Sequence, residues 1–599
     1  MSQLRTRWSR QAGSQAPLPE YPRPMLVRPR WASLNGPWQY AVRPALGGPE
    51  TSPAREQVPK RWDGEIVVPY AIETGSSGVG RALQPDEVLH YRRTVSVPES
   101  WRGGRVVVWF EAVDHHCAVR VDGRLVAEHR GGYLPFSAEL PRTDRDQVEL
   151  LVSVRDPSDA GLQQRGKQSL QPRDIWYTAT SGIWQPVWLE PLPEAAVTSV
   201  VAVATPDLTA LDVVVEAEQP GPVTVEVGLP GGGAARAQGQ VAQPVRVRLA
   251  EPRPWSPGDP HLYPVVATTA TDRVESWAAL RTVRVGTPPG GSRPVVLLND
   301  APVLLNTPLS QGYWPESGMT APSDEALRYD LEVVRDLGFT GVRCHIKVES
   351  RRFYHHADRL GLLVLQDAVS GGRPRVGLAG SGLVQALGLP AEDRSCWALR
   401  QAGRADRANR EEFIAELEGL VRHLMGHACV VMWVPFNEAW GQFDARGAAR
   451  FLRRLDPTRL VDHASGWFDQ GAGDVRSRHR YVLALQRPPA RDRRPYLVSE
   501  YGGLNLAVPG HLWHESARFG YRFFDDQAAL AEAFTRLYRD QLVPLVRHGL
   551  AGCVYTQVSD VEIETNGLLT YDREVLKLDP DLVRALNADL EAAFQAAHR

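Results

Sequence analysis

The hydrophobic pattern of this chain changes its period near residue 288, and this change constrains the fold more than any other feature. Before that point, short runs alternate apolar and polar residues, as in "LDVVVEAE" (211–218) and "PVTVEVGL" (222–229). Such alternation is typical of strands that bury one face. In the second half of the chain, short apolar runs take turns with amphipathic helical segments. That order predicts parallel strands joined by helices.

One of these helical segments shows the signals clearly. Leu327 and Leu331 repeat at helical spacing, Ser323 is placed to cap the N-terminus, and Gly338 is placed to end the helix. Short apolar strands such as "LLVLQD", "VVMWV" and "PYLVS" are spread among further helices of this kind. We therefore predict a (β/α)₈ barrel over residues 288–599.

The first half of the chain reads as two β-sandwich domains behind an N-terminal segment (1–30). Strands and turn residues over 31–192 predict a jelly roll, with a two-residue hairpin turn at Asp122-Gly123. Shorter alternating strands over 193–287 predict an immunoglobulin-like sandwich. A linker rich in glycine and proline follows at 286–294. The expected fold class is thus multidomain, with a jelly-roll sandwich, an immunoglobulin-like sandwich and a TIM barrel.

Charge and cysteine content exclude several classes of function. There are 68 Lys and Arg against 70 Asp and Glu, so no nucleic acid or anionic membrane is expected as partner. No run of 18 apolar residues and no signal-like start occur, which predicts a cytoplasmic protein that does not span a membrane. Five scattered cysteines predict neither a disulfide framework nor a zinc site. We expect no metal ligand set.

Two carboxylates stand where apolar strands end. "VVMWVPFNEAW" finishes in Asn437-Glu438, and "PYLVSEYGG" finishes in Glu500. In a barrel of this type the chemistry sits at the C-terminal ends of the strands. Two acids from different strands are what glycoside hydrolysis requires, one to protonate the leaving oxygen and one to act at the anomeric carbon. The alternative is that each acid only pairs with an arginine at a strand end.

The chain resembles glycoside hydrolase family 2, which holds β-galactosidases, β-glucuronidases and β-mannosidases. The likeness spans nearly the whole length and rests on motifs that occur in the family's order. They are "DIWYTATSGIWQPVWLEP", "RPWSPGDPHLYPV", "GVRCHIKVESRRFYHHADRLGLLVLQD", "FNEAW" and "SEYGG". The resemblance implies an exo-acting retaining enzyme that removes a terminal sugar through a covalent glycosyl intermediate.

The resemblance also assigns roles to residues. It implies that Glu438 is the general acid/base, Glu500 the nucleophile, and Asn437 the amide that holds the sugar 2-hydroxyl. It implies that Arg343 and Tyr481 contact the nucleophile. For these roles to divide, we expect burial and the charge of Glu500 to keep a proton on Glu438 near neutral pH.

Five further residues are candidate sugar contacts. His345 comes two places after Arg343, where family galactosidases carry a histidine three places after it, so its role stays open. Lys347 either reaches the sugar or faces water, and Asp174 either enters the barrel mouth or lies on a solvated loop. Trp440 and Tyr555, close to strand ends, are candidate platforms for sugar stacking.

The leading specificity from the resemblance is β-galactosidase. β-Mannosidase, β-glucuronidase, β-galacturonidase and α-L-arabinopyranosidase remain alternatives, and so does a non-catalytic carbohydrate-binding protein on the same scaffold. The family's glucuronidases carry an Asn-x-Lys element, and no lysine stands two places after Asn566. The expected partner is a small glycoside or oligosaccharide. No cofactor is required; a bound Mg²⁺ or Na⁺ and a homo-oligomer stay open.

Overall fold

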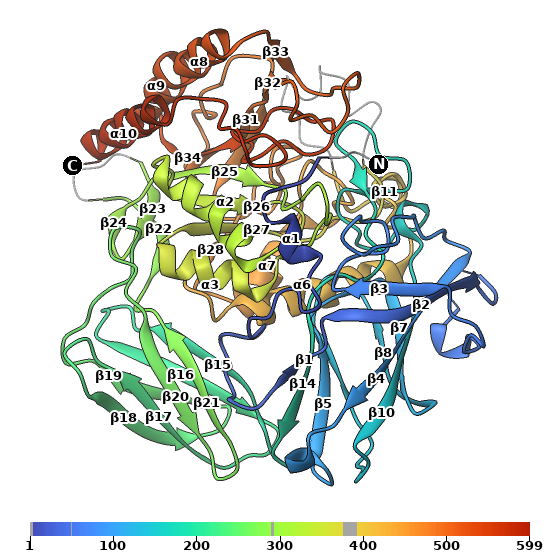
Figure 1. Cartoon of the computed structure of the whole chain (residues 1–599). Helices are drawn as coiled ribbons and strands as arrows, with labels where there is room; N and C mark the ends of the chain where they lie inside the picture. Colours follow the sequence, from blue (N-terminus) through green and yellow to red (C-terminus); the bar gives the residue numbers. More distant parts are fainter. Residues whose placement is uncertain (1–3, 49–50, 289–292, 375–391, 599) are drawn as a thin grey trace.

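The computed structural model describes residues 4–48, 51–288, 293–374 and 392–598. Two β-sandwich domains lie side by side against one side of a larger α/β domain (Figure 1). The middle of the predicted linker, residues 289–292, lies outside the described residues. Within the described residues, no helix is long and apolar enough to cross a membrane.

The first domain is an antiparallel sandwich of two main sheets. One sheet has the order β1 (Ala32–Ser33), β14 (Val187–Leu192), β5 (Arg105–Phe110) and β9 (Phe136–Glu139). The other has the order β3 (Gly64–Val68), β2 (Gly36–Pro44), β4 (Glu87–Ser96), β10 (Gln147–Arg155), β7 (His116–Val121) and β8 (Arg124–Arg130). The predicted hairpin is confirmed, since Asp122 and Gly123 join β7 to β8 with φ of 49° and 80°.

The second domain is a smaller sandwich. One sheet has the order β15 (Val197–Ala204), β16 (Ala210–Ala217) and β19 (Pro244–Arg248). The other has the order β18 (Ala234–Gln240), β17 (Pro222–Gly228), β20 (Tyr263–Thr268) and β21 (Arg273–Ala278). A third sheet, of β22 (Val283–Gly286), β23 (Val295–Leu298) and β24 (Ala301–Pro302), spans the boundary that the sequence places at 287–288. This sheet connects the sandwich to the barrel.

The third domain is the predicted barrel. Its eight parallel strands are ordered β29 (Leu460–Val461), β28 (Val430–Val434), β27 (Leu363–Asp367), β26 (Gly341–Cys344), β25 (Leu305–Ser310), β34 (Leu550–Thr556), β31 (Tyr496–Gly502) and β30 (Arg476–Arg480). The helices around them are α2 (Asp324–Asp336), α3 (Arg351–Leu360), α5 (Cys396–Gln401), α6 (Arg407–Leu424), α7 (Ala445–Leu455), α8 (Gln527–Arg536), α9 (Val543–Val546) and α10 (Pro580–Ala597). The described residues between β29 and β31 form no helix, so the repeat is incomplete there.

Local signals explain most of these elements. Ser323 caps α2 by accepting a hydrogen bond from the Ala326 N–H, as predicted. Helices α8 and α9 form one continuous helical run over 527–546 that passes through a π-helical turn, Leu537–Leu542. Pro544 lies just after it and has no N–H to donate to the preceding turn, which accounts for the π-helical turn.

The N-terminal segment contacts all three domains: its first part packs on the barrel, Asn35 of the first sandwich donates to the carbonyl oxygens of Pro17 and Leu18, and Arg28 donates to Asp272 of the second sandwich. The segment contains the short helix α1 (Ser9–Ala12), which lies beside α2 in Figure 1. Trp8 is buried in the barrel core and contacts Tyr329 of α2 at 5.2 Å between ring centroids. The N–H of Thr6 donates to Glu316, in the loop after β25, at 3.2 Å. The segment therefore ties the first domain to the barrel.

Candidate active site

Glu438 and Glu500 meet at the C-terminal ends of the barrel strands. Glu438 follows β28, and its backbone φ of 50° turns the chain sharply after the strand. Glu500 lies within β31. One carboxylate oxygen of each acid and a ring nitrogen of His479 all lie within 4.8 Å of one another. The side chain of Glu438 is 22% exposed and that of Glu500 is 5% exposed, so Glu500 is the deeper of the two.

Arg343, at the end of β26, connects the predicted residues. Its guanidinium donates to Glu500 Oε1 at 3.2 Å, to the Asn437 side-chain oxygen at 2.9 Å and to both oxygens of Asp367 at 3.0 Å. Burial lowers the pKa of Arg343, but Asp367 and Glu500 outweigh it and hold that pKa above its usual value. Arg343 is thus a permanent buried cation that fixes one oxygen of Glu500.

Tyr481 and His479 approach the acids from the neighbouring strand. The Tyr481 hydroxyl donates to Glu500 Oε2, and its ring stacks on Tyr521 at 4.0 Å. Nδ1 of His479 lies 2.9 Å from Glu438 Oε1 and 3.5 Å from Glu500 Oε2. His479, which we did not predict, is thus the side chain that lies between the two carboxylates.

The protonation state of Glu438 differs from our expectation. Burial raises the pKa of this carboxyl, as expected, but the hydrogen bond and charge of His479 lower it, followed by the charges of Lys167 and Arg343. The net pKa lies below the ordinary value for a glutamate. We expected burial and the charge of Glu500 to prevail, and His479, which outweighs them, was not predicted beside this acid. The free site therefore favours ionised Glu438.

His345 and Asp367 form a second layer behind the acids. Nδ1 of His345 lies 2.8 Å from Asp367 Oδ2, and Asp367 also holds Arg343. Burial, and next the positive charge of Lys167, lower the pKa of His345 well below its usual range. The ring is therefore neutral, and Asp367 orients it. Whether its other nitrogen meets a sugar stays a proposal.

Lys347 is placed differently from the sugar contact considered for it. Its ammonium donates to the carbonyl oxygens of Gly312 and Met319 at 2.6 and 2.8 Å, and to Glu349 Oε1 at 2.6 Å. These bonds use all three N–H donors of a lysine. The side chain is 2% exposed. Lys347 thus supports the loop after β25, and we leave it out of the proposed sugar contacts.

A Lys347→Met variant should therefore be unstable rather than defective in substrate binding. Removing the cation leaves the Glu349 carboxylate buried without a charge partner, which costs about 3–5 kcal/mol in the free energy of unfolding. Chemical denaturation measures this loss, and Lys60→Met, at an exposed position, is the matched control. KM of the enzyme that remains folded should be unchanged. A raised KM with normal stability would return Lys347 to the sugar site.

Asp174 matches the solvated-loop alternative, whereas Trp440 lies differently from expectation. Asp174 is exposed, on the loop between β11 (Gln168–Ser169) and β12 (Tyr177–Thr178) of the first sandwich. Trp440 is only 5% exposed, because Trp176 from the same loop packs on it at 4.8 Å between ring centroids. The half-buried Trp176, which we did not predict, thus covers the tryptophan expected to stack on sugar.

The structure corrects the position of Tyr555. Side chains alternate along a strand, so Glu500 and its neighbour Tyr501 point to opposite faces of β31. The Tyr555 ring packs on Tyr501 at 5.7 Å and on Phe534 of α8 at 5.1 Å. Tyr555 therefore lies between the barrel and α8, outside the site. The next residue, Thr556, reaches the site instead, 3.2 Å from the Tyr481 hydroxyl.

The first sandwich completes the mouth of the barrel. The Tyr177 hydroxyl donates to Glu564, and the Thr178 N–H donates to Glu562 Oε1 at 2.8 Å. Both acids belong to the loop after β34, and Asn566 on the same loop donates to Glu564 at 2.9 Å. These contacts join residues almost 400 positions apart, with separations of 387 and 384. No local sequence pattern could have predicted them.

Three groups of described residues bring potential metal ligands together. They are Asp358, His427 and Cys429; His115, Glu412 and Glu416; and Glu438, His479 and Glu500. In the first, Asp358 is already held by His427 and by the Cys429 N–H, both at 2.8 Å. The third is the candidate catalytic pair itself, so a metal there would block both acids. The hydrogen bonds of Asp358 and the role of Glu438 and Glu500 as the candidate catalytic pair account for these two groups without a bound metal.

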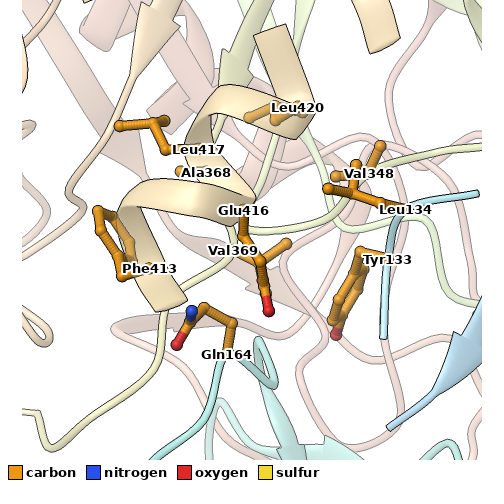
Figure 2. Close-up of a pocket in the computed structure, with 10 residues that line it drawn as sticks. All are labelled: Tyr133, Leu134, Gln164, Val348, Ala368, Val369, Phe413, Glu416, Leu417 and Leu420. Carbon is orange, nitrogen blue, oxygen red and sulfur yellow. The ribbon is translucent and has the colours of Figure 1, made fainter. Parts of the chain in front are cut away.

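Figure 2 shows a cavity at the interface between the first sandwich and the barrel. Apolar side chains dominate its lining, and Glu416 of α6 points into it near Gln164 and Tyr133. Burial raises the pKa of Glu416 to about 8, and its Oε1 has no hydrogen-bond partner among the described residues. Neither Glu438 nor Glu500 lines this cavity. It holds a single neutral acid and is not the reaction site.

A (β/α)₈ barrel that presents two close carboxylates at its strand ends defines a glycoside hydrolase. This chain belongs to glycosyl hydrolase family 2. The model of that family's TIM barrel domain matches residues 296–584, and the model of its sugar binding domain matches residues 31–193.

Curated relatives carry more than one activity. The chain is 24% identical to a β-glucuronidase of Streptococcus agalactiae over 370 residues, which cover 58% of each chain. It is 24% identical to β-galactosidase 2 of Enterobacter cloacae over 494 residues, which cover 74% of this chain and 43% of that one. The match thus spans less than two thirds of either relative.

Solved structures share the fold over nearly the whole chain. A β-galacturonidase from Eisenbergiella tayi superposes with a TM-score of 0.66 at 18% identity, covering 94% of this chain and 97% of that one. A β-D-glucuronidase of Dictyoglomus thermophilum superposes with a TM-score of 0.70 at 18% identity, covering 95% and 98%. At this identity the likeness shows the three-domain architecture and leaves the substrate open.

Proposed function

We propose that this chain is an exo-acting retaining β-glycosidase that removes a terminal sugar through a covalent glycosyl intermediate. The observation that supports this most is the spacing of Glu438 and Glu500, which have one carboxylate oxygen each within 4.8 Å of the other. A retaining pair lies about 5–5.5 Å apart, whereas an inverting pair needs about 6.5–9.5 Å to admit a water.

The surroundings of the acids support a division of roles. Glu500 is the nucleophile, because Arg343 and Tyr481 each donate a hydrogen bond to one of its two oxygens and so fix its orientation. Glu438, which is more exposed, is the acid/base and faces the departing aglycone. Arg343 holds the oxygen of Asn437, which leaves the amide N–H₂ to donate to the sugar 2-hydroxyl.

An exo mode of action follows from the cover over the barrel. Loops of the first sandwich reach the loop after β34 through Tyr177 and Thr178. Glu500 is 5% exposed and Glu438 is 22% exposed, so we infer a pocket that is closed at the sugar end and open toward Glu438. Such a pocket accepts a terminal sugar and rejects the middle of a polymer.

Proton transfer in this site depends on His479. Glu438 must carry a proton when the glycosidic bond breaks, yet His479 favours its ionised form in the free site. We therefore expect activity to fall as the pH rises through the lowered pKa of Glu438. His479 acts here as a positioning residue that sets the alkaline limit of catalysis.

Replacing His479 with phenylalanine should extend activity to higher pH. The change removes the hydrogen bond and charge that lower the pKa of Glu438, so that pKa rises and the protonated acid persists to higher pH. The alkaline limb of the kcat/KM profile, which reports the free enzyme, measures this. His514→Phe, at an exposed position, is the control. An unmoved limb, or one moved to lower pH, would contradict this role.

The glycone is the finer part of the proposal. The family resemblance favours a β-galactoside, and the relatives and superposed structures add β-glucuronides and β-galacturonides. Hydrolysis of aryl β-galactoside, glucoside, mannoside, glucuronide, galacturonide and α-L-arabinopyranoside tests the proposal directly. We expect turnover of at least one, with loss in Glu500→Ala. No turnover of any, or equal turnover in that variant, would overturn the proposed activity.

A further inference from the structure

A segment of the first sandwich enters the barrel mouth beside the candidate site. The N–H groups of Arg165 and Gly166 donate to the Ser370 carbonyl oxygen at 3.1 and 3.0 Å, in the loop after β27. Gly166 has a φ of 64°, and a Cβ there would lie 2.9 Å from the carbonyl oxygen of Ile346. Only glycine permits so close an approach. The next residue, Lys167, is thereby brought to the loop after β26.

The ammonium of Lys167 lies over the ring of Tyr177, with Nζ 5.6 Å from the ring centroid. Tyr177 in turn is bonded to Glu564 at the far side of the mouth. The positive charge of Lys167 contributes to lowering the pKa of Glu438 and the pKa of His345. Lys167 therefore lies at the mouth, between Tyr177 and the loop after β26.

Lys167 differs from the other lysines of the barrel and its interface. Lys347 and Lys577 are buried and each pairs with a carboxylate at 2.6 Å. Lys167 is half-buried, and over the ranges that the structure describes it forms no ion pair and its ammonium makes no hydrogen bond. A half-buried ammonium with no directly bonded carboxylate can gain a charge-assisted hydrogen bond from an added anion.

We propose that Lys167 binds an anionic group of the substrate, the carboxylate of a terminal hexuronic acid, and so determines specificity for β-hexuronides. This inference rests on the proposed glycosidase function. A neutral hexose offers only hydroxyl groups, which leave the positive charge without a partner, whereas a carboxylate at C6 supplies a charge-assisted hydrogen bond. The nearby acids are already engaged, Glu500 by Arg343 and Glu564 by Tyr177.

A rival explanation is that Lys167 acts only on Glu438. In that case its charge adjusts the acid and makes no contact with the substrate. The two explanations differ in one respect. The influence of Lys167 on Glu438 is common to every glycoside, whereas a lysine that also binds a carboxylate adds a further loss of activity that only uronides show.

The experiment compares matched substrates that differ only at C6: aryl β-glucuronide with β-glucoside, and aryl β-galacturonide with β-galactoside. We expect the wild type to favour one uronide over its neutral partner by about tenfold or more in kcat/KM. Lys167→Met should lower kcat/KM on that uronide by about 10²- to 10³-fold, while the neutral substrate changes little. Lys167→Arg should keep the uronide preference, and Lys60→Met, at an exposed position, should change neither.

The outcomes separate this inference from the function on which it rests. A wild type that hydrolyses only neutral glycosides overturns the role of Lys167 and leaves the glycosidase intact. If Lys167→Met loses kcat/KM equally on the uronide and on its neutral partner, and the alkaline limb of the profile shifts, then Lys167 acts only through Glu438. That result would also overturn the proposed carboxylate contact. A wild type without turnover overturns the glycosidase as well. If Lys167→Met does not fold, competitive inhibition of the wild type tests the carboxylate contact instead. Free hexuronate should then inhibit more strongly than the matching hexose, and equal or weaker inhibition would overturn the contact.

Discussion

Glu500→Ala will lower kcat on any aryl β-glycoside that the wild type hydrolyses by about 10⁴- to 10⁶-fold. The variant lacks the carboxylate that attacks the anomeric carbon, so no glycosyl intermediate can form. Arg343 keeps its two bonds to Asp367 and its bond to Asn437, so the site should stay folded around the gap. Steady-state kinetics measure the loss of kcat, and thermal unfolding measures whether the variant stays folded.

The control and a rescue make the result specific. Glu515→Ala removes an exposed glutamate and should leave kcat unchanged. Adding azide to Glu500→Ala should restore part of the turnover on an activated substrate, because the small anion can attack from the vacated side and give the inverted glycosyl azide. If Glu500→Ala retained more than about a tenth of wild-type turnover, Glu500 would not be the nucleophile.

Glu438→Gln will lower kcat/KM by about 10²- to 10⁴-fold on substrates with poor leaving groups. The amide has nearly the shape of the acid but cannot give a proton to the departing oxygen. A dinitrophenyl glycoside needs no such proton, so formation of its glycosyl intermediate should be nearly as fast as in the wild type. His479 loses its carboxylate partner in this variant and keeps its place beside Glu500.

The leaving-group series is the decisive readout for Glu438. A plot of log kcat/KM against leaving-group pKa should be steep for Glu438→Gln and shallow for the wild type. The Glu515→Gln control should follow the wild type throughout. A uniform loss across the series would mean that Glu438 supports the structure or binds the sugar and does not transfer a proton.

The parts of this site that could be predicted from the sequence are those that a strand carries to its own end. Asn437, Glu438 and Glu500 follow apolar runs directly, and parallel strands in a barrel bring such ends together. Arg343 was predictable for the same reason. The buried guanidinium then joins Asn437 to Glu500.

Other residues depend on details that local patterns do not contain. His479 pairs with Glu500 across a register shift in β30, so its direction could not be read from alternation alone. Tyr555 was predicted one residue away from the side chain that reaches the site, because the facing side of β34 is set by its neighbours. Lys167 and Trp176 come from another domain, and only the docking of the first sandwich on the barrel brings them to the mouth.

The most direct test of the central claim is the anomeric configuration of the sugar first released from an aryl β-glycoside, followed by proton NMR before mutarotation. Carboxylates as close as those of Glu438 and Glu500 leave no room for a water between sugar and base, so the account predicts the β anomer. Release of the α anomer would contradict it.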